Sequence, residues 1–225
     1  MIRLVLFDID GTLILSGGAG EKAFSEVCRI EFGVPDGTAR LNFAGRTDTS
    51  IIREFFTQYD IKTSAENFQR FLGRYVFHLD HLLGRLDGTV LPGVHELIRD
   101  LRALPQPPML GLLTGNIVLG AEIKLRHYRL WDEFVMGAFA DDHEDRNGIA
   151  RVARERGSRL LRRPLAGPEI VVIGDTPRDV ECARAIDAKC LAVATGKFSV
   201  KELRPEKATW TVGSLTEIRA RELCG

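Results

Sequence analysis

The stretch LVLFDIDGTLI, residues 4–14, places two acidic residues, Asp8 and Asp10, at the end of an apolar run. The run Leu4–Phe7 is continuous rather than alternating, which is typical of a strand buried on both faces of a parallel sheet. Asp10-Gly11, between LVLF and TLIL, is also a signal for a hairpin. The two acids therefore have three interpretations at this point: a turn, an isolated structural acid, or a catalytic pair.

Further apolar runs of the same kind follow along the chain. They occupy residues 109–113, 134–139, 170–173 and 190–194, with a weaker run at 209–212. Helical patterns follow the turn Pro92-Gly93 and then Asn116, Arg146 and Pro177. Alternating strands and helices predict a doubly wound, mainly parallel α/β sheet, a Rossmann-like core.

Residues 16–87 interrupt this alternation, because they contain helical patterns but no candidate strand. The longest apolar stripe lies within residues 68–83 and continues over four turns. Gly17-Gly18 and Asp87-Gly88 are candidate hinges at the two ends of the segment. We therefore predict an α/β core of residues 1–15 and 88–225 and a small helical cap of residues 16–87 that closes over the sheet.

The amino-acid composition indicates which kinds of binding partner the protein has. The 31 basic and 31 acidic residues balance to a net charge of zero, which argues against a broad nucleic-acid surface. The four cysteines show no zinc-binding spacing, and no apolar run is long enough to span a membrane. We expect a cytoplasmic protein, a monomer or a homodimer, that binds neither nucleic acid nor membrane.

Polar residues also follow two later strands of the predicted sheet. Thr114 ends one strand, and Asp175 and Asp179 follow another. Because the carboxyl ends of parallel strands border one crevice, we expect these side chains to gather with Asp8 and Asp10. A cluster of oxygen ligands suits Mg²⁺, which also relieves the repulsion among neighbouring carboxylates.

A phosphate site is predicted at the same edge. Thr114 offers a hydroxyl, and the amides of Gly115 and Asn116 precede a helix, whose N-terminus attracts anions. Together with the acids, these groups favour a magnesium-dependent phosphoryl-transfer site.

These motifs resemble the haloacid dehalogenase superfamily. The resemblance is carried by DIDGT at residues 8–12, by Thr114 and by GDTPRD at residues 174–179, and it extends over nearly the whole chain. The segment between the first motif and LPGV, residues 91–94, is similar to the helical cap of phosphoglycolate phosphatase-like members.

The resemblance implies a role for each acid. Asp8 would be the nucleophile that forms an aspartyl-phosphate, and Asp10 would protonate the leaving alcohol and then activate water. The Asp8 carboxylate, the Asp10 backbone carbonyl and Asp175 would hold Mg²⁺, with Asp179 behind them or as a further ligand. The acid at position 10 favours a phosphatase over a dehalogenase. Thr176 and Asp179 have a second interpretation as caps of the following helix.

The sequence departs from the family in its third motif, which usually carries a lysine. Residues 139–147, FADDHEDRN, contain none. Arg146 is the best substitute, although its planar fork differs from an ammonium group. The alternative is that Arg146 lies on the surface and that Lys197 or Arg178 provides the charge.

A substrate-binding residue is expected in the cap. In GRTD, residues 45–48, Thr47 or Asp48 is the expected N-cap of a helix, which leaves Arg46 free to reach a substrate carboxylate or phosphate.

The sequence thus predicts a magnesium-dependent phosphatase that hydrolyses a small phosphorylated metabolite through an aspartyl-phosphate. Two alternatives remain. A phosphomutase would use the same residues, and a catalytically weak phospho-aspartate regulatory or binding protein would follow from the missing lysine.

Overall fold

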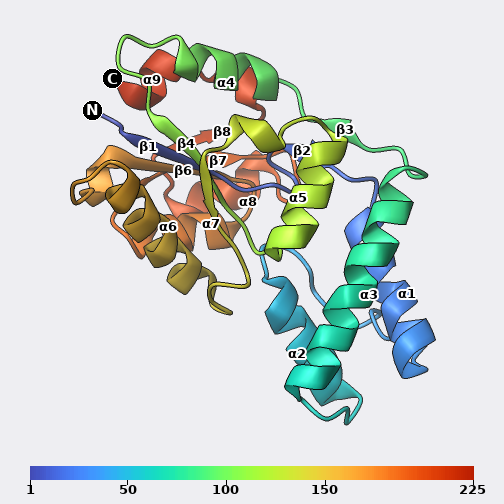
Figure 1. The fold of residues 1–225 in the computed structure, drawn as a ribbon. Helices are drawn as coiled ribbons and strands as arrows, with labels where there is room; N and C mark the ends of the chain where they lie inside the picture. Colours follow the sequence, from blue (N-terminus) through green and yellow to red (C-terminus); the bar gives the residue numbers. More distant parts are fainter.

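A six-stranded parallel sheet forms the centre of the computed structural model, which describes residues 1–225 (Figure 1). The strand order is β5-β4-β1-β6-β7-β8. The strands are β1 (Leu4–Phe7), β4 (Met109–Leu113), β5 (Met136–Ala138), β6 (Ile170–Gly174), β7 (Lys189–Val193) and β8 (Trp210–Val212). The predicted fold class and all six predicted strands are confirmed.

Two details of the strands differ from the sequence prediction. The strand expected over residues 134–139 is shorter, because Phe134 closes the 3₁₀ turn Trp131–Glu133 before β5 begins. Two short strands were not predicted, β2 (Ile14–Leu15) and β3 (Thr89–Val90), which pair antiparallel. Two residues are too few to show a strand period, and their partners are far apart in the sequence.

Helices cover both faces of the sheet. On one face lie α4 (Val94–Arg102), α5 (Val118–His127) and α9 (Ala220–Cys224), and on the other lie α6 (Arg146–Leu160), α7 (Pro177–Arg184) and α8 (Val200–Leu203). In β1, Val5 and Phe7 belong to the first apolar cluster, whereas Leu4 and Leu6 belong to the second. Burial on both sides explains why the strands are continuously apolar.

The connections between strands change direction across the sheet between β1 and β6. The chain adds β4 and β5 on one side of β1, and then returns to add β6, β7 and β8 on the other. Phe7 therefore pairs with both Leu112 and Ile173. In open α/β sheets, ligands bind at such a switch point, outside the carboxyl ends of the strands.

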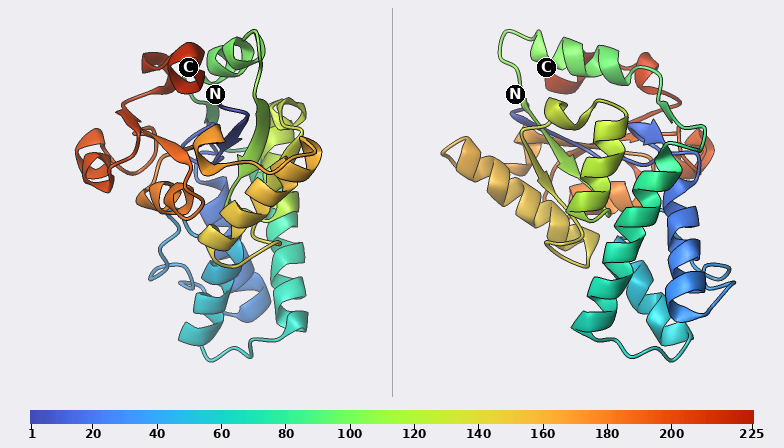
Figure 2. Two further views of the ribbon diagram at one scale, coloured as in Figure 1. Left: turned by 90° about the vertical axis from the view of Figure 1, so that its left-hand side faces the viewer. Right: turned by 45° about the vertical axis from the view of Figure 1, so that its right-hand side comes forward.

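Three further helices form a separate layer at this end of the sheet: α1 (Ala19–Phe32), α2 (Asp48–Gln58) and α3 (Ala65–Leu83) (Figures 1 and 2). The chain termini lie toward the opposite end of the molecule. The helices share an apolar cluster rich in aromatic rings, including Phe24, Phe71 and Tyr75. We call these helices and their loops the cap; its exact boundaries at residues 16 and 87 stay a prediction.

The two connections between core and cap lie against each other. They carry the strands β2 and β3, and Gly17 and Gly18 follow with φ values of 62° and 82°. A Cβ atom at Gly17 would lie 2.5 Å from the carbonyl oxygen of Asp87, so the close approach of the two connections requires glycine there. Their proposed action as hinges stays a prediction.

No helix combines the length and the apolar character that crossing a bilayer would require.

Candidate active site

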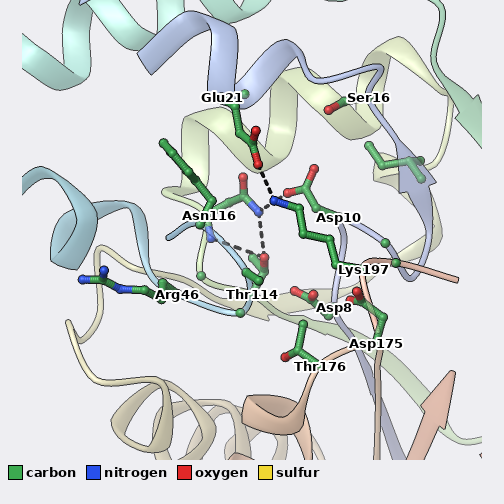
Figure 3. Close-up of a pocket in the computed structure, with 18 of the residues that line it drawn as sticks. Asp8, Asp10, Ser16, Glu21, Arg46, Thr114, Asn116, Asp175, Thr176 and Lys197 are labelled. Atoms are coloured by element: carbon green, nitrogen blue, oxygen red, sulfur yellow. Dashed lines mark hydrogen bonds and ion pairs between the residues drawn. The ribbon is translucent and has the colours of Figure 1, made fainter. Parts of the chain in front are cut away.

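A cavity of about 520 Å³ lies between the carboxyl ends of the strands and the cap (Figure 3). Eight of the nine predicted site residues line it, and Asp179 lies behind them. The eight are Asp8, Asp10, Arg46, Thr114, Gly115, Asn116, Arg146 and Asp175. The expectation that distant motifs would meet at one edge of the sheet therefore agrees with the structure.

The loop after β1 presents Asp8 and Asp10 to this cavity. The amides of Thr12, Leu13 and Ile14 all donate to the carbonyl oxygen of Ile9, at 3.3, 2.9 and 3.1 Å. Gly11 has a φ of 82°, which turns the chain sharply after the strand. The interpretation as a turn and the interpretation as an acidic pair are therefore compatible, because the turn orients the two carboxylates toward the cavity.

Asp8, Asp175 and Asp179 form a buried cluster in which one ligand atom from each lies within 4.8 Å of the others. Burial raises the pKa of Asp8 from 3.8 to about 6, with Asp179 adding to the shift and Arg146 opposing it. Burial together with Asp179 and Asp8 raises the pKa of Asp175 to about 8. Carboxylates that resist ionisation in this way are stabilised by a bound cation, so the cluster fits a divalent metal.

Asp179 is fully engaged by protein donors. Its Oδ1 accepts from Arg146, and its Oδ2 accepts from the amide and the hydroxyl of Thr176, at 2.9 and 2.7 Å. Thr176 is the N-cap of α7, so the capping interpretation holds for this pair. Asp175 has one oxygen bonded to the Thr12 hydroxyl at 3.3 Å. The geometry therefore favours Asp8 and Asp175 as direct ligands, with Asp179 behind them.

Arg146 lies inside the acidic cluster and not on the surface. Its side chain is 5% exposed, and one Nη2 atom contacts both Asp8, at 3.0 Å, and Asp179. Asp145 caps the first turn of α6, which fixes where the helix begins and so aims Arg146 at the cavity. Its Nη1 reaches the carbonyl oxygen of Gly45 in the cap at 3.4 Å, whereas Nε has no partner. The alternative of a surface arginine is therefore excluded, and the role of Arg146 in place of the family's lysine stays a prediction.

A phosphate site was predicted around Thr114, Gly115 and Asn116, and we call this part of the cavity the phosphate side. Its hydrogen bonds differ in detail from that prediction. α5 begins at Val118, and the amides of Ile117 and Val118 donate to Asp48, at 2.8 Å, and to Asp141, at 2.6 Å. The amide of Asn116 donates to the Thr114 hydroxyl oxygen at 3.3 Å. Protein groups therefore already occupy most of the donors at this helix start.

Thr114 keeps a free proton for a ligand. Its oxygen accepts from both the amide and the side chain of Asn116, at 3.3 and 2.9 Å (Figure 3). With its lone pairs in use, the hydroxyl can still donate its hydrogen. Thr114 and the Gly115 amide remain the donors available to an anion on this side.

Lys124, which the sequence analysis did not identify, contacts Asp10. Its buried Nζ lies 2.6 Å from Asp10 Oδ2 and 2.7 Å from the Asn116 side-chain oxygen. Lys124 occupies the apolar stripe of α5, seven residues after Ile117 and three after Ala121, both of which are buried. A lysine on the buried face of a helix that follows a catalytic strand was the available signal.

Arg46 does not point toward the acidic cluster (Figure 3). Its guanidinium pairs with Glu54 and donates to the Ser50 carbonyl oxygen at 3.2 Å, both on α2. Thr47 is the N-cap of α2, as one of the two predicted alternatives had it. Binding of substrate by Arg46 stays a prediction, and it would require the arginine to leave Glu54.

The loop around Arg46 attaches the cap to the core. The Asp48 amide donates to the Gly115 carbonyl oxygen at 2.7 Å, and the Thr47 hydroxyl donates to the Glu144 carbonyl oxygen at 2.7 Å. Arg53 forms a two-pronged ion pair with Glu144. A Cβ atom at Gly115 would collide with the Arg46 carbonyl oxygen, so the close contact requires glycine. The cap thus lies against the phosphate side of the cavity.

The chain belongs to the haloacid dehalogenase-like hydrolases, because that family's model matches residues 5–193. The predicted family, and with it the prediction of an enzyme of the hydrolase class, is confirmed.

A similar protein is the phosphoglycolate phosphatase of Chromobacterium violaceum, 29% identical over 96% of this chain and 95% of that protein. Among solved structures, a predicted phosphoglycolate phosphatase from Haemophilus somnus has a TM-score of 0.72 at 16% identity, with 96% of both chains covered. The β-phosphoglucomutase of Clostridium difficile has a TM-score of 0.74 at 15% identity, covering 99% of this chain and 96% of that one. At these identities, the two structures show a shared fold.

Proposed function

We propose that the protein is a magnesium-dependent phosphatase that hydrolyses a small phosphomonoester through an aspartyl-phosphate on Asp8. The observation that carries the proposal is the arrangement at the switch point. Asp8 and Asp175 are buried together at the ends of adjacent strands, while the Asp10 side chain is 42% exposed and lines the cavity. This arrangement supports a nucleophile at Asp8, a metal site that includes Asp175 and a proton-transfer group at Asp10, all at one end of the cavity.

Mg²⁺ would be held by the carboxylates of Asp8 and Asp175 and by the backbone carbonyl of Asp10. These are hard oxygen donors, and burial raises the pKa values of Asp8 and Asp175, so a bound cation would favour the ionised form of both carboxylates. When bound, the ion would supply positive charge to the carboxylates and to the incoming phosphate.

In the first half of the reaction, an Asp8 carboxylate oxygen attacks the phosphorus of the ester. The bond between phosphorus and the ester oxygen breaks, and Asp10 gives its proton to the departing oxygen, which leaves as an alcohol. Thr114 and the Gly115 amide donate hydrogen bonds to the transferring group. Arg146 keeps Asp8 ionised and holds it in place through the contact at 3.0 Å.

In the second half, a water molecule loses a proton to Asp10 and attacks the same phosphorus. The bond between phosphorus and Asp8 breaks, which releases orthophosphate and restores both acids to their starting states. The cap over the cavity would limit the approach of other water molecules to the intermediate.

The similar protein from Chromobacterium violaceum makes phosphoglycolate the first substrate to test. The shared fold with a β-phosphoglucomutase leaves transfer to a sugar as an alternative, because a mutase would use the same acids. A cytoplasmic monomer or homodimer that binds neither nucleic acid nor membrane remains our proposal for the state of the protein.

A panel of phosphorylated metabolites, assayed with Mg²⁺, tests the proposal. Release of orthophosphate that stops on chelation and returns with added Mg²⁺ would support it. Isomerisation of a hexose phosphate without net release would favour the mutase. A stable phosphoprotein with no product release would favour the regulatory or binding protein.

A further inference from the structure

We propose that Lys124 is a positioning residue for Asp10, which holds one oxygen of the Asp10 carboxyl group so that the other faces the substrate. The inference rests on the proposed function, because it assigns Lys124 a task in the proton transfers that Asp10 performs.

Three contacts join Asp10, Lys124 and Asn116 in a closed ring. Lys124 Nζ donates to Asp10 Oδ2 at 2.6 Å and to Asn116 Oδ1 at 2.7 Å. The side-chain amide of Asn116 donates to the same Asp10 Oδ2 at 2.8 Å. Each member thus contacts the other two, which fixes the rotation of the Asp10 carboxyl group more firmly than a single bond would.

The two oxygens of Asp10 are consequently unlike. Oδ2 accepts two hydrogen bonds, one of them from a charged donor, whereas Oδ1 accepts none from the protein. Asp10 lines the cavity. Oδ1 is therefore the oxygen that gives a proton to the leaving group and takes one from water, while Oδ2 serves as the anchor.

The burial of Lys124 indicates that its contact with Asp10 is not an ordinary ion pair at the protein surface. Its side chain is 4% exposed, and a buried ammonium group is costly unless it is paired and hydrogen-bonded. The lysine lies on the buried face of α5, where an apolar residue would pack without that cost. A purely structural role, in which Lys124 only ties α5 to the loop after β1, is the alternative that the experiment must exclude.

The test uses Lys124→Met, which removes the charge, with Lys124→Gln as a second variant and Lys201→Met on the surface as the control. Two substrates are compared. p-Nitrophenyl phosphate has a leaving group that departs without a proton, so only the second half of its reaction needs Asp10. An alkyl phosphate that the wild-type enzyme hydrolyses needs Asp10 in both halves.

We expect the Lys124 variants to lose roughly tenfold or more in kcat on the alkyl phosphate, with little change in KM. On p-nitrophenyl phosphate they should release the first equivalent of p-nitrophenol rapidly and then turn over slowly, which is seen as a burst of absorbance. The burst amplitude counts the folded active sites, so a variant that folds only in part still gives a result. Asp10→Asn should give the same pattern, and the double variant should lose little more than Asp10→Asn alone.

Three results would overturn the inference: undiminished kcat in both Lys124 variants, an equal loss of the first-turnover rate on both substrates, or losses that multiply in the double variant. Each of these results is obtained with a wild-type protein that is an active phosphatase, so each rejects the role of Lys124 and not the proposed function. The proposed function fails in a different way, if the wild-type protein hydrolyses none of the phosphomonoesters.

Discussion

The core wall of the cavity carries most of its charged side chains, whereas the wall that the cap provides carries most of its hydrophobic ones. On the core side lie Asp8, Asp10 and Asp175 with the two buried cations Arg146 and Lys124. On the cap side, the hydrophobic side chains that line the cavity are Phe24, Phe43, Ala44, Ile51 and Tyr75. The three charged groups there already have partners: Arg46 pairs with Glu54, Glu21 pairs with Lys197 at 2.8 Å, and Asp48 accepts from the Ile117 amide at 2.8 Å.

This difference indicates that the core and the cap contribute to the reaction in different ways. Proton transfer and attack on phosphorus need charges at fixed positions, and the strand ends supply them. The cap supplies cover and shape, with few free polar groups to recognise a substrate. Changes to the core wall should therefore affect kcat, whereas changes to the cap wall should affect KM.

The largest effect is expected for Asp8→Asn. Without the nucleophile, hydrolysis of every phosphomonoester should fall by at least about 10³-fold, while the fold is kept. Steady-state kinetics measure the loss, and circular dichroism checks the fold. Activity near the wild-type level in this variant would exclude Asp8 as the nucleophile.

Asp10→Asn should rank next, with a loss of about 10²- to 10⁴-fold in kcat on alkyl phosphates. Asparagine keeps the shape of the side chain but cannot give or take the proton. If the alkyl and p-nitrophenyl esters lost first-turnover rate to the same degree, Asp10 would not be the proton donor.

Arg146 offers a test of stability as well as activity. Arg146→Met leaves the buried carboxylates of Asp8 and Asp179 without their cation, and it should cost about 3–5 kcal/mol of unfolding free energy. Arg146→Lys, the matched variant, keeps the charge and should cost less, with activity partly retained. Urea denaturation measures both. Equal stability of the methionine variant and the wild type would show that the cation is dispensable.

The cap wall is tested with Arg46→Gln and its partner variant Glu54→Gln. If Arg46 leaves Glu54 to bind a carboxylate-bearing substrate, Arg46→Gln should raise KM by up to about tenfold with kcat nearly unchanged. Glu54→Gln frees the arginine and should not raise KM. A parallel rise of KM in both variants would instead indicate that the pair only stabilises α2.

The last effect is on stability alone and concerns Asp48, whose buried side chain joins the cap to the start of α5. Burial raises its pKa from 3.8 to about 7, with Asp10 and Asp141 adding and Lys124 opposing. Between these values the folded state holds a proton that the unfolded state has lost, so the stability from this residue falls as the pH rises from about 4 to about 7.

Asp48→Asn should remove that pH dependence. Relative to the variant, the wild type should lose on the order of 2 kcal/mol of unfolding free energy between about pH 5 and about pH 8. Urea denaturation at the two pH values measures the change, with Asp132→Asn on the surface as the control. A constant difference between wild type and Asp48→Asn would contradict the raised pKa.

Sequence reasoning found the core wall because its residues follow local rules. Asp8 and Thr114 come directly after a continuous apolar run and Asp175 follows one residue later, and parallel strands bring such positions to one edge. Arg146 could be placed because it begins a helix in the region where the family has its lysine.

The contacts that sequence reasoning missed mostly join residues that lie far apart in the sequence. Lys124 reaches Asp10 across 114 positions, and Asp48 accepts from Ile117 across 69. The amides at the start of α5 donate to Asp48 and Asp141, which are also distant in the sequence. The general rule that such amides are free to bind an anion therefore did not apply to them. The orientation of Arg46 depends on Glu54, eight residues later on α2.

The central claim, that Asp8 carries the phosphoryl group during turnover, can be tested by chemical trapping. The enzyme is mixed with substrate and Mg²⁺, quenched in acid and reduced with borohydride, which converts an acyl phosphate to an alcohol, and its peptides are then analysed by mass spectrometry. We predict reduction at residue 8 alone, dependent on substrate and absent from Asp8→Asn. Reduction at another acid, or full turnover with no modification at residue 8, would contradict the mechanism.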